Sequence, residues 1–275
     1  MKLKKLFCIA PVLLFLGASA AHAQSETSTL GKIKKEGVMK VCYAQGSPES
    51  YKDPKTGEWL GVFVDLANEL ATWAKVKIQP VEVQWNTAVL ALKRGDCDFF
   101  GSSFVYNAPR ALEVNFVTPF RSKGLNAIIR KDNKKNIKKI EDLNNPNVTI
   151  AVGLGSREYE TGKRLFPKAK FLALQINSDV ETLPPTQRGD ADVTILPIIN
   201  INWWLQIPEN AAWGKMAFPG EDFGNAPVGW AVRYGDQEWK DFLDQYVRWV
   251  QANDLVKRTY DEYMAKTNPF AKKQQ

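Results

Sequence analysis

The chain has 275 residues, 37 of them basic and 30 acidic, and a formal net charge of +7. Charges of both signs are mixed along the sequence without an arginine-rich arm, so nothing in it predicts a nucleic-acid-binding patch. One histidine and three cysteines leave few side chains for a transition-metal site.

The first 23 residues have the pattern of a cleavable secretory signal peptide. Three lysines within residues 1–5 precede an apolar run at 6–17, and Ala21-His22-Ala23 forms a small-x-small cleavage site. The run is too short for a stable membrane-spanning helix, and the alternative is an uncleaved anchor. We therefore expect export to the periplasm.

Cleavage would remove three lysines and no acid, which reduces the net charge to +4. It would also remove His22, the only histidine. Without histidine, Ser-His-Asp and Cys-His catalysis and His-ligated metal sites are excluded, and we predict no catalytic residue, metal or cofactor. Cys42 and Cys97 remain, either as a disulfide or as two buried thiols.

Strands and helices are predicted to alternate in the first half of the chain. Apolar and β-branched residues between turn residues favour strands at 38–43, 76–83 and 98–104. Capping and apolar spacing favour helices at 30–37, at 65–74 after Asp65, and at 87–93 after Asn86. This alternation is typical of a parallel α/β sheet.

The same alternation is predicted to restart after residue 124. Strands are expected at 125–130, 148–152, 171–174 and 192–196, and helices at 157–165 and 178–187. Residues 198–223 are predicted to be loop-rich, and a strand at 228–233 and amphipathic helices at 236–253 and 255–266 follow. The mature chain is therefore predicted to form two α/β lobes.

Eight segments in this order resemble the family 3 periplasmic solute-binding proteins of polar-amino-acid ABC transporters. They are LGKIKKEGVMKV at 30–41, GVFVDLANELA at 61–71, AVLALKRGDCD at 88–98, APRALEVNFVTPF at 108–120, IEDL at 140–143, VGLGSRE at 152–158, RGDADVTIL at 188–196 and GWAVR at 229–233. Each is weak alone, but together they span almost the whole mature chain.

The resemblance implies a two-lobed periplasmic-binding-protein fold of type II with two hinge crossings. Lobe I would comprise residues 24–122 and 225–275, and lobe II residues 123–224. The protein would be a monomer that closes on a small carboxylate-bearing solute, an amino acid or a related compound. It would deliver this solute to an ABC-transporter permease in the inner membrane.

The resemblance also implies a ligand site. Arg110 would bind the ligand's carboxylate, for which a planar, permanently charged fork is suited. Gly155, Ser156 and Arg157 would complete the carboxylate clamp from lobe II, where amide groups at a helix start attract an anion. The other expected ligand-binding residues are Trp85 as a pocket wall, Ser102 and Ser103, and Asn107, which replaces a threonine of the family.

Two departures from the family concern the ligand's ammonium group. Pro197 stands where amino-acid binders usually carry the aspartate that pairs with the ammonium, and Val105 replaces a hydroxyl residue. A buried ammonium without a counter-charge costs several kcal/mol. Either another acid substitutes, with Glu49 and Asp222 as candidates, or the ligand is not an ordinary α-amino acid, which is the interpretation we favour.

Two other functions remain open at this stage. One is a periplasmic enzyme of the cyclohexadienyl-dehydratase type, whose general acid would be Glu49, Glu158 or Asp222. The other is a ligand-binding module for a sensor or dehydrogenase partner. Trp203 and Trp204 would then form the contact, unless they cover the core of lobe II. We predict a binding protein rather than an enzyme.

Overall fold

The computed structural model describes residues 28–132, 134–266 and 268–271. The predicted signal peptide, residues 1–23, lies outside these ranges. Within them, every helix is too short or too polar to cross a membrane.

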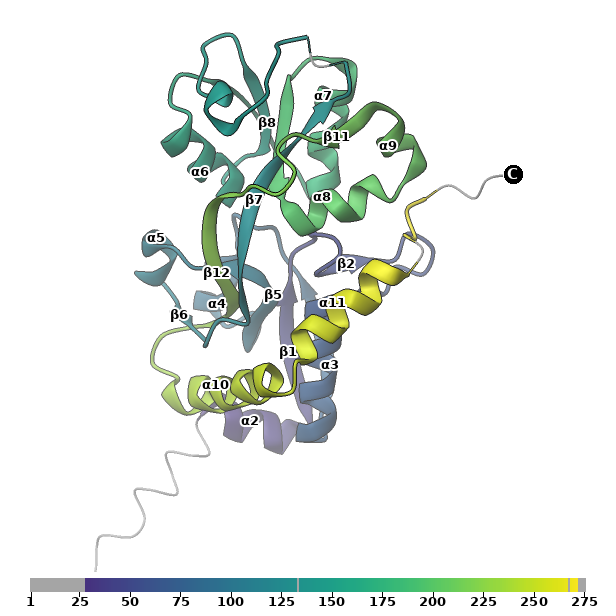
Figure 1. The fold of residues 1–275 in the computed structure, drawn as a ribbon. Helices are drawn as coiled ribbons and strands as arrows, with labels where there is room; N and C mark the ends of the chain where they lie inside the picture. The colour runs from purple at the N-terminus through teal and green to yellow at the C-terminus, as the bar shows by residue number, and fades with distance from the viewer. Residues whose placement is uncertain (1–27, 133, 267, 272–275) are drawn as a thin grey trace, which may run out of the picture.

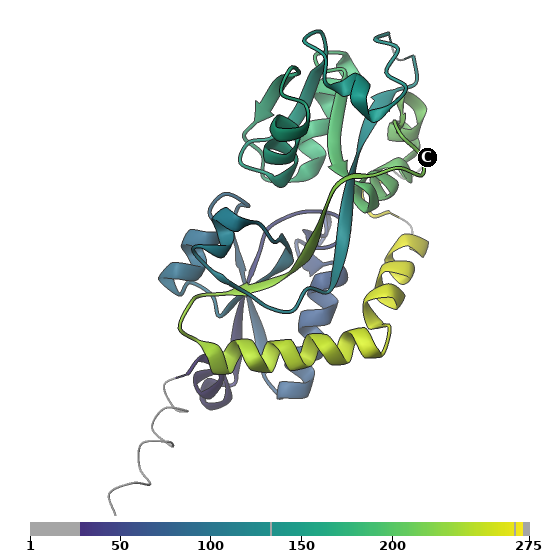
Figure 2. The same ribbon diagram turned by 60° about the vertical axis from the view of Figure 1, so that its left-hand side comes forward.

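Ten strands of the described chain form one sheet, in which two long antiparallel strands occupy the middle. These two are β7 (Arg121–Arg130) and β12 (Phe223–Val232). The order across the sheet is β4-β1-β5-β12-β7-β10-β8-β9, with β6 on β12 and β11 on β7. The chain gathers into a lower and an upper part, and β7 and β12 run between them (Figures 1 and 2).

The lower part contains the parallel strands at one end of the sheet. They are β1 (Val38–Tyr43), β4 (Lys77–Glu82) and β5 (Phe99–Val105), with β6 (Asn115–Phe116) nearby and a separate hairpin of β2 (Tyr51–Lys52) and β3 (Trp59–Leu60). Its helices are α2 (Thr29–Glu36), α3 (Val62–Ala74), α4 (Ala88–Arg94), α5 (Ala108–Ala111), α10 (Gln237–Ala252) and α11 (Leu255–Ala265). The last two helices pack on α2 and α3, far earlier in the sequence. β4 is an edge strand, which accommodates Pro80.

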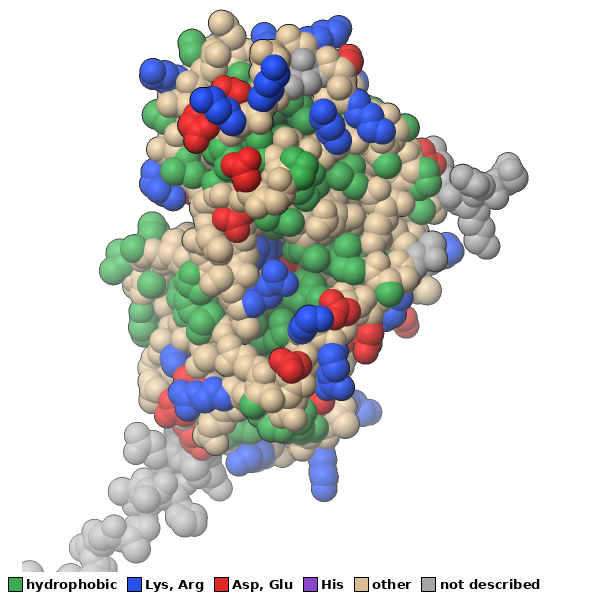
Figure 3. Space-filling model, in the orientation of Figure 1, with side chains coloured by type: hydrophobic (Ala, Val, Ile, Leu, Met, Phe, Trp, Pro, Cys, Tyr) green, Lys and Arg blue, Asp and Glu red, His purple; other side chains and the backbone are tan. Residues whose placement is uncertain are grey.

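The upper part contains the other parallel strands, β8 (Thr149–Gly153), β9 (Lys170–Leu174) and β10 (Val193–Pro197), with β11 (Gly214–Met216) against β7. Its helices are η1 (Ile140–Leu143), α6 (Arg157–Leu165), η2 (Asp179–Thr182), α7 (Leu183–Arg188), α8 (Ile198–Leu205) and α9 (Pro208–Trp213). Basic and acidic side chains are interspersed over both parts on the face in Figure 3, as the mixed sequence charge predicts.

The predicted alternation of strands and helices is confirmed, but two predictions in the upper part are wrong. Residues 198–223 are not loop-rich, because they contain α8, α9 and β11. α8 contains three isoleucines and two tryptophans, which have low helix propensity, so the sequence does not predict a helix there. The predicted helix at 178–187 divides into η2 and α7, since prolines follow Leu183 at the start of α7.

Two helix starts are also shifted. Thr87, not Asn86, is the N-cap residue of α4. α3 begins at Val62 rather than Asp65, directly after Gly61, which has a φ of 129°. A Cβ at Gly61 would lie 2.5 Å from a backbone oxygen, so this position requires glycine.

The two cysteines form a disulfide. Cys42 on β1 and Cys97, just before β5, have Cα atoms 5.6 Å apart. Both side chains are buried among small and aromatic residues of the lower part. Of the two alternatives left by the sequence, the structure has the bridge.

Candidate ligand-binding site

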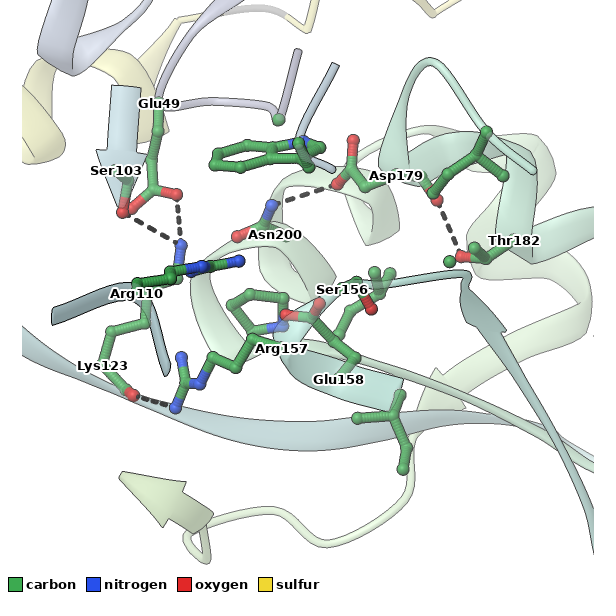
Figure 4. Close-up of a pocket in the computed structure, with 17 residues that line it drawn as sticks. Glu49, Ser103, Arg110, Lys123, Ser156, Arg157, Glu158, Asp179, Thr182 and Asn200 are labelled. Atoms are coloured by element: carbon green, nitrogen blue, oxygen red, sulfur yellow. Dashed lines mark hydrogen bonds and ion pairs between the residues drawn. The ribbon is translucent and has the colours of Figure 1, made fainter. Parts of the chain in front are cut away.

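A pocket lies between the two parts and is partly open to solvent. Its lining residues are Gly46, Glu49, Trp85, Ser103 and Arg110 from the lower part, Lys123 from β7, and Gly153, Ser156, Arg157, Glu158, Ile176, Asp179, Thr182, Ile195, Leu196, Pro197 and Asn200 from the upper part (Figure 4).

Five of the eight predicted site residues line this pocket, namely Trp85, Ser103, Arg110, Ser156 and Arg157. Ser102, Asn107 and Gly155 are not among its described lining residues. Arg110 comes from the lower part and Arg157 from the upper part, and Figure 4 shows both guanidinium groups in the same pocket. The pocket therefore brings two guanidinium groups together.

Arg110 is positioned by a short capped helix. The side chain of Asn107 caps α5 and accepts a hydrogen bond from the Arg110 N–H at 2.9 Å. The guanidinium lies over the Phe104 ring, 4.1 Å from its centroid, and Nη1 donates to the Val105 carbonyl at 3.1 Å. The pKa of Arg110 is lowered to about 10, mainly by burial; nearby Glu158 opposes this shift and Arg157 adds to it. A ligand carboxylate would offset this burial.

Arg157 is the first residue of α6, which Ser156 caps through its hydroxyl. Only 7% of Arg157 is exposed, and burial lowers the pKa of its guanidinium. Nη2 donates to the carbonyl of Lys123 on β7, at 2.6 Å, and to that of Gly224 on β12. Nε and Nη1 are buried and have no hydrogen-bond partner among the described residues. Two donors are therefore left for an anion.

The two serines on β5 have different surroundings. Ser102 is fully buried and hydrogen-bonds with the backbone of Ala44 and the hydroxyl of Ser50, so its hydroxyl connects β1 to β5. The Ser103 hydroxyl lies in the pocket and accepts from the Lys123 ammonium at 3.3 Å.

Trp85 forms one wall of the pocket. Its indole N–H donates to the Gln45 carbonyl at 2.9 Å, and its ring meets Phe100 edge to face. A Cβ at Gly46 would lie 3.1 Å from the Trp85 ring, so glycine there leaves room for the indole.

A buried ion pair lies on the side of the pocket that the lower part of the chain forms, and it could not be recognised from the sequence. The Lys123 ammonium donates to one oxygen of Glu49, and the Tyr260 hydroxyl donates to the other. Glu49 and Lys123 are 2% and 7% exposed. These partners are up to 211 residues apart, and no local motif connects them. Because both of its oxygens are engaged, Glu49 is a poor partner for a ligand ammonium.

Asp179 and Asn200 line the upper side of the pocket and were also missed. Asp179 accepts from the Asn200 amide at 3.0 Å and from the Trp204 indole at 2.9 Å. Burial raises the pKa of its carboxyl. From the sequence, Asp179 is expected at the start of the helix predicted for 178–187, and Asn200 in the segment predicted to be loop-rich. Asp222, the other acid considered, is not among the described lining residues and lies against Gly124.

A family model described as "Bacterial extracellular solute-binding proteins, family 3" matches residues 39–266. A glutamine-binding protein of Geobacillus stearothermophilus is 27% identical over 182 residues, 65% of this chain and 68% of that protein. Cyclohexadienyl dehydratase of Pseudomonas aeruginosa is 22% identical over 255 residues, 92% of each chain. The crystal structure of an ancestral amino acid-binding protein, a precursor of cyclohexadienyl dehydratase, is similar with a TM-score of 0.77 at 29% identity and covers 86% of this chain and 100% of its own.

Proposed function

We propose a ligand class for this chain, which belongs to the bacterial extracellular solute-binding proteins of family 3. It binds a small carboxylate-bearing solute, an amino acid or a close relative of one. It would deliver this solute to an ABC transporter of the inner membrane after export to the periplasm. The observation that carries the proposal is the pair of arginines in one pocket. Two buried donors of Arg157 have no partner among the described residues, and Arg110 brings a second, half-buried guanidinium. A ligand carboxylate would supply hydrogen-bond acceptors and a negative counter-charge to both guanidinium groups.

The proposed mechanism is closure of two lobes on the ligand. Lobe I would comprise residues 24–122 and 225–275, and lobe II residues 123–224. Two observations support these boundaries. One apolar cluster lies entirely within residues 125–223, and β7 and β12 are the strands that connect the two parts. Since lining residues come from both parts, the pocket would be complete only when the lobes are together.

The test is to purify the mature protein, denature it and identify released small molecules by mass spectrometry. The refolded, ligand-free protein is then titrated with each candidate by calorimetry. We expect an amino acid or related carboxylate to bind at one site per chain. If only solutes without a carboxylate are released and rebind, the proposal is wrong.

We further propose that the chain is not an enzyme, although one relative is a dehydratase. Pro197 provides no acid at the end of β10, and Glu49 is held by Lys123 and Tyr260. Purified protein incubated with prephenate should give no product, and turnover that disappears in Glu158→Gln would overturn this statement.

The suggestion that Trp203 and Trp204 contact a partner protein is wrong. Trp203 and Trp204 are at most 1% exposed. Their rings pack on Tyr51 and Phe270, so they are unavailable to another molecule.

A further inference from the structure

Exposed lysines gather at the end of the upper part that lies away from the lower part. Residues 130–139, which begin at the last residue of β7, contain six basic residues and one acid. Figure 1 shows β7 rising from the lower part into the upper part, and Figure 3 shows Lys and Arg side chains at that end of the molecule. Five exposed lysines of this segment form what we call the apical patch, namely Lys131, Lys134, Lys135, Lys138 and Lys139.

The backbone that carries the apical patch is anchored at several points. Ile137 is 5% exposed and belongs to the apolar cluster of the upper part. At the start of the segment, the Lys131 N–H donates to the carbonyl of the last residue of α9, at 2.8 Å. At its end, the Asp142 carboxylate accepts from the N–H groups of Lys138 and Lys139, at 2.8 and 3.1 Å. The lysines therefore project from a held loop.

The acids near the apical patch do not neutralise it. Asp132 forms an ion pair with Arg130 at 2.5 Å, and Asp190 forms one with Arg188 at 2.8 Å. The Asp142 carboxylate is engaged by backbone N–H groups. Within the described chain, no ammonium of the apical patch lies at ion-pair distance from a carboxylate. The patch therefore carries five positive charges without a counter-charge from these residues.

A depression on the surface adds two further cations beside the apical patch. Lys134 and Lys135 line it together with Arg130 and Arg188. Two acids also line it; one is the ion-pair partner of Arg130, and the other, Asp192, accepts the N–H of the first residue of β8 at 2.8 Å. An anionic group placed in the depression would meet four cations.

The composition of the apical patch favours a membrane surface over a protein surface. The exposed residues of the segment are charged or polar, because its one apolar residue, Ile137, is buried. Protein interfaces usually have an apolar or aromatic centre, and the described residues of this segment provide none. Lysine is a flexible point charge that needs no partner of fixed geometry. Clusters of about 4–8 basic residues are typical of segments that bind anionic lipids.

We propose that the apical patch docks the chain on a membrane surface that contains anionic phospholipids. The lipid phosphate groups supply the counter-charges, and the contact is electrostatic. No lysine of the apical patch is among the described lining residues of the ligand pocket, so docking leaves the pocket free. This inference goes beyond the proposed function and does not depend on what the pocket binds. Docking would keep an exported chain beside the membrane that holds its transporter.

The experiment mixes the mature protein with vesicles and separates bound from free protein by sedimentation. One set of vesicles contains equal amounts of phosphatidylglycerol and phosphatidylcholine, and the other contains phosphatidylcholine alone. At about 0.1 M salt, we expect binding to the anionic vesicles at least about 100-fold tighter than to the neutral ones. At about 1 M salt the screening length falls from about 10 Å to about 3 Å, and this difference should disappear.

Two double variants locate the docking surface. Each lysine near an anionic surface contributes about 5-fold, so Lys134→Gln with Lys135→Gln should weaken binding to the anionic vesicles about 25-fold. Lys34→Gln with Lys35→Gln is the matched control, because it removes the same charge from two exposed lysines of α2, at the other end of the molecule. It should change binding less than about 2-fold, since the attraction falls off within a screening length.

The outcomes decide the proposal in both directions. Binding that requires phosphatidylglycerol, disappears at high salt and is weakened only in the variant of the apical patch supports it. Equal losses in the two double variants would show that total charge attracts the vesicles, and the proposal would be wrong. It would also be wrong if neutral and anionic vesicles bound alike, or if the protein bound heparin in solution but neither kind of vesicle.

Discussion

At the scale of single residues, Arg110 combines charge with a fixed fork of donors. Its guanidinium is held by the Phe104 ring and the Val105 carbonyl, so it would meet a ligand carboxylate already oriented. A lysine would keep the charge and lose both the fork and the stacking. Charge alone is therefore insufficient at this position.

We predict that Arg110→Ala abolishes ligand binding and that Arg110→Lys weakens it about 100-fold. Calorimetry with the ligand identified by mass spectrometry measures both. Arg94→Lys, in an exposed ion pair with Asp96, is the control and should have no effect. Unchanged affinity in Arg110→Ala would contradict the carboxylate clamp.

Lys123 and Glu49 form the buried pair that connects β7 to the lower part. Lys123→Met leaves the Glu49 carboxylate buried without a cation, which should lower the free energy of unfolding by about 3–5 kcal/mol. Lys123→Met combined with Glu49→Gln should recover most of this loss, because the uncompensated charge is gone. Urea unfolding measures both variants.

Lys93→Met provides the matched control, since Lys93 forms an exposed pair with Glu113. Its effect should stay within about 0.5 kcal/mol. Equal destabilisation by Lys93→Met and Lys123→Met would show that burial does not decide the effect.

At the scale of elements, the disulfide fastens β1 to the start of β5. It closes a loop with a sequence separation of 55 residues, for which the chain-entropy relation gives about 4 kcal/mol of stabilisation. We predict that Cys42→Ala with Cys97→Ala lowers the free energy of unfolding by about this amount. The ligand should still bind with the same stoichiometry, because neither cysteine lines the pocket. Loss of binding in a folded double variant would contradict this separation.

Elements with local signals could be predicted from the sequence, and the others could not. α6 has a serine cap and a polar first turn, and its predicted bounds, 157–165, are confirmed. α8 lacks a capping side chain, and its apolar residues surround the helix because both parts of the chain bury it. The Asp179 and Asn200 pair depends on α8, so no local pattern could place these side chains together.

At the scale of the whole molecule, the segment at residues 268–271 makes a contact that joins the two parts beside the pocket. The C-terminal segment, residues 268–271, follows α11 of the lower part and packs on α8 of the upper part. The Asn268 amide donates to the Trp203 carbonyl at 2.8 Å, and the Phe270 ring lies 5.2 Å from that of Trp204. Trp204 in turn donates to Asp179, so this contact reaches the pocket.

We predict that Phe270→Ala favours a more open molecule and weakens ligand binding about 10-fold, since part of the contact that holds the parts together is lost. Small-angle X-ray scattering should show a larger radius of gyration without ligand and a return to the unmodified value at saturation. Leu90→Ala, on the exposed side of α4, should change neither quantity. A variant as compact as the unmodified chain would exclude a role for this segment in closure.

The late position of α10 and α11 in the sequence has a consequence for biogenesis. The apolar cluster of the upper part is complete once residue 223 has been synthesised. The large cluster, which contains the core of the lower part and the buried residues of α8, instead awaits the last two helices, which cover α2 and α3. A chain interrupted after β12 would therefore expose the apolar faces of α2 and α3 while the cluster within residues 125–223 is already formed. Such a product should be bound by chaperones or degraded, so quality control during export would retain only chains that are complete at the C-terminus.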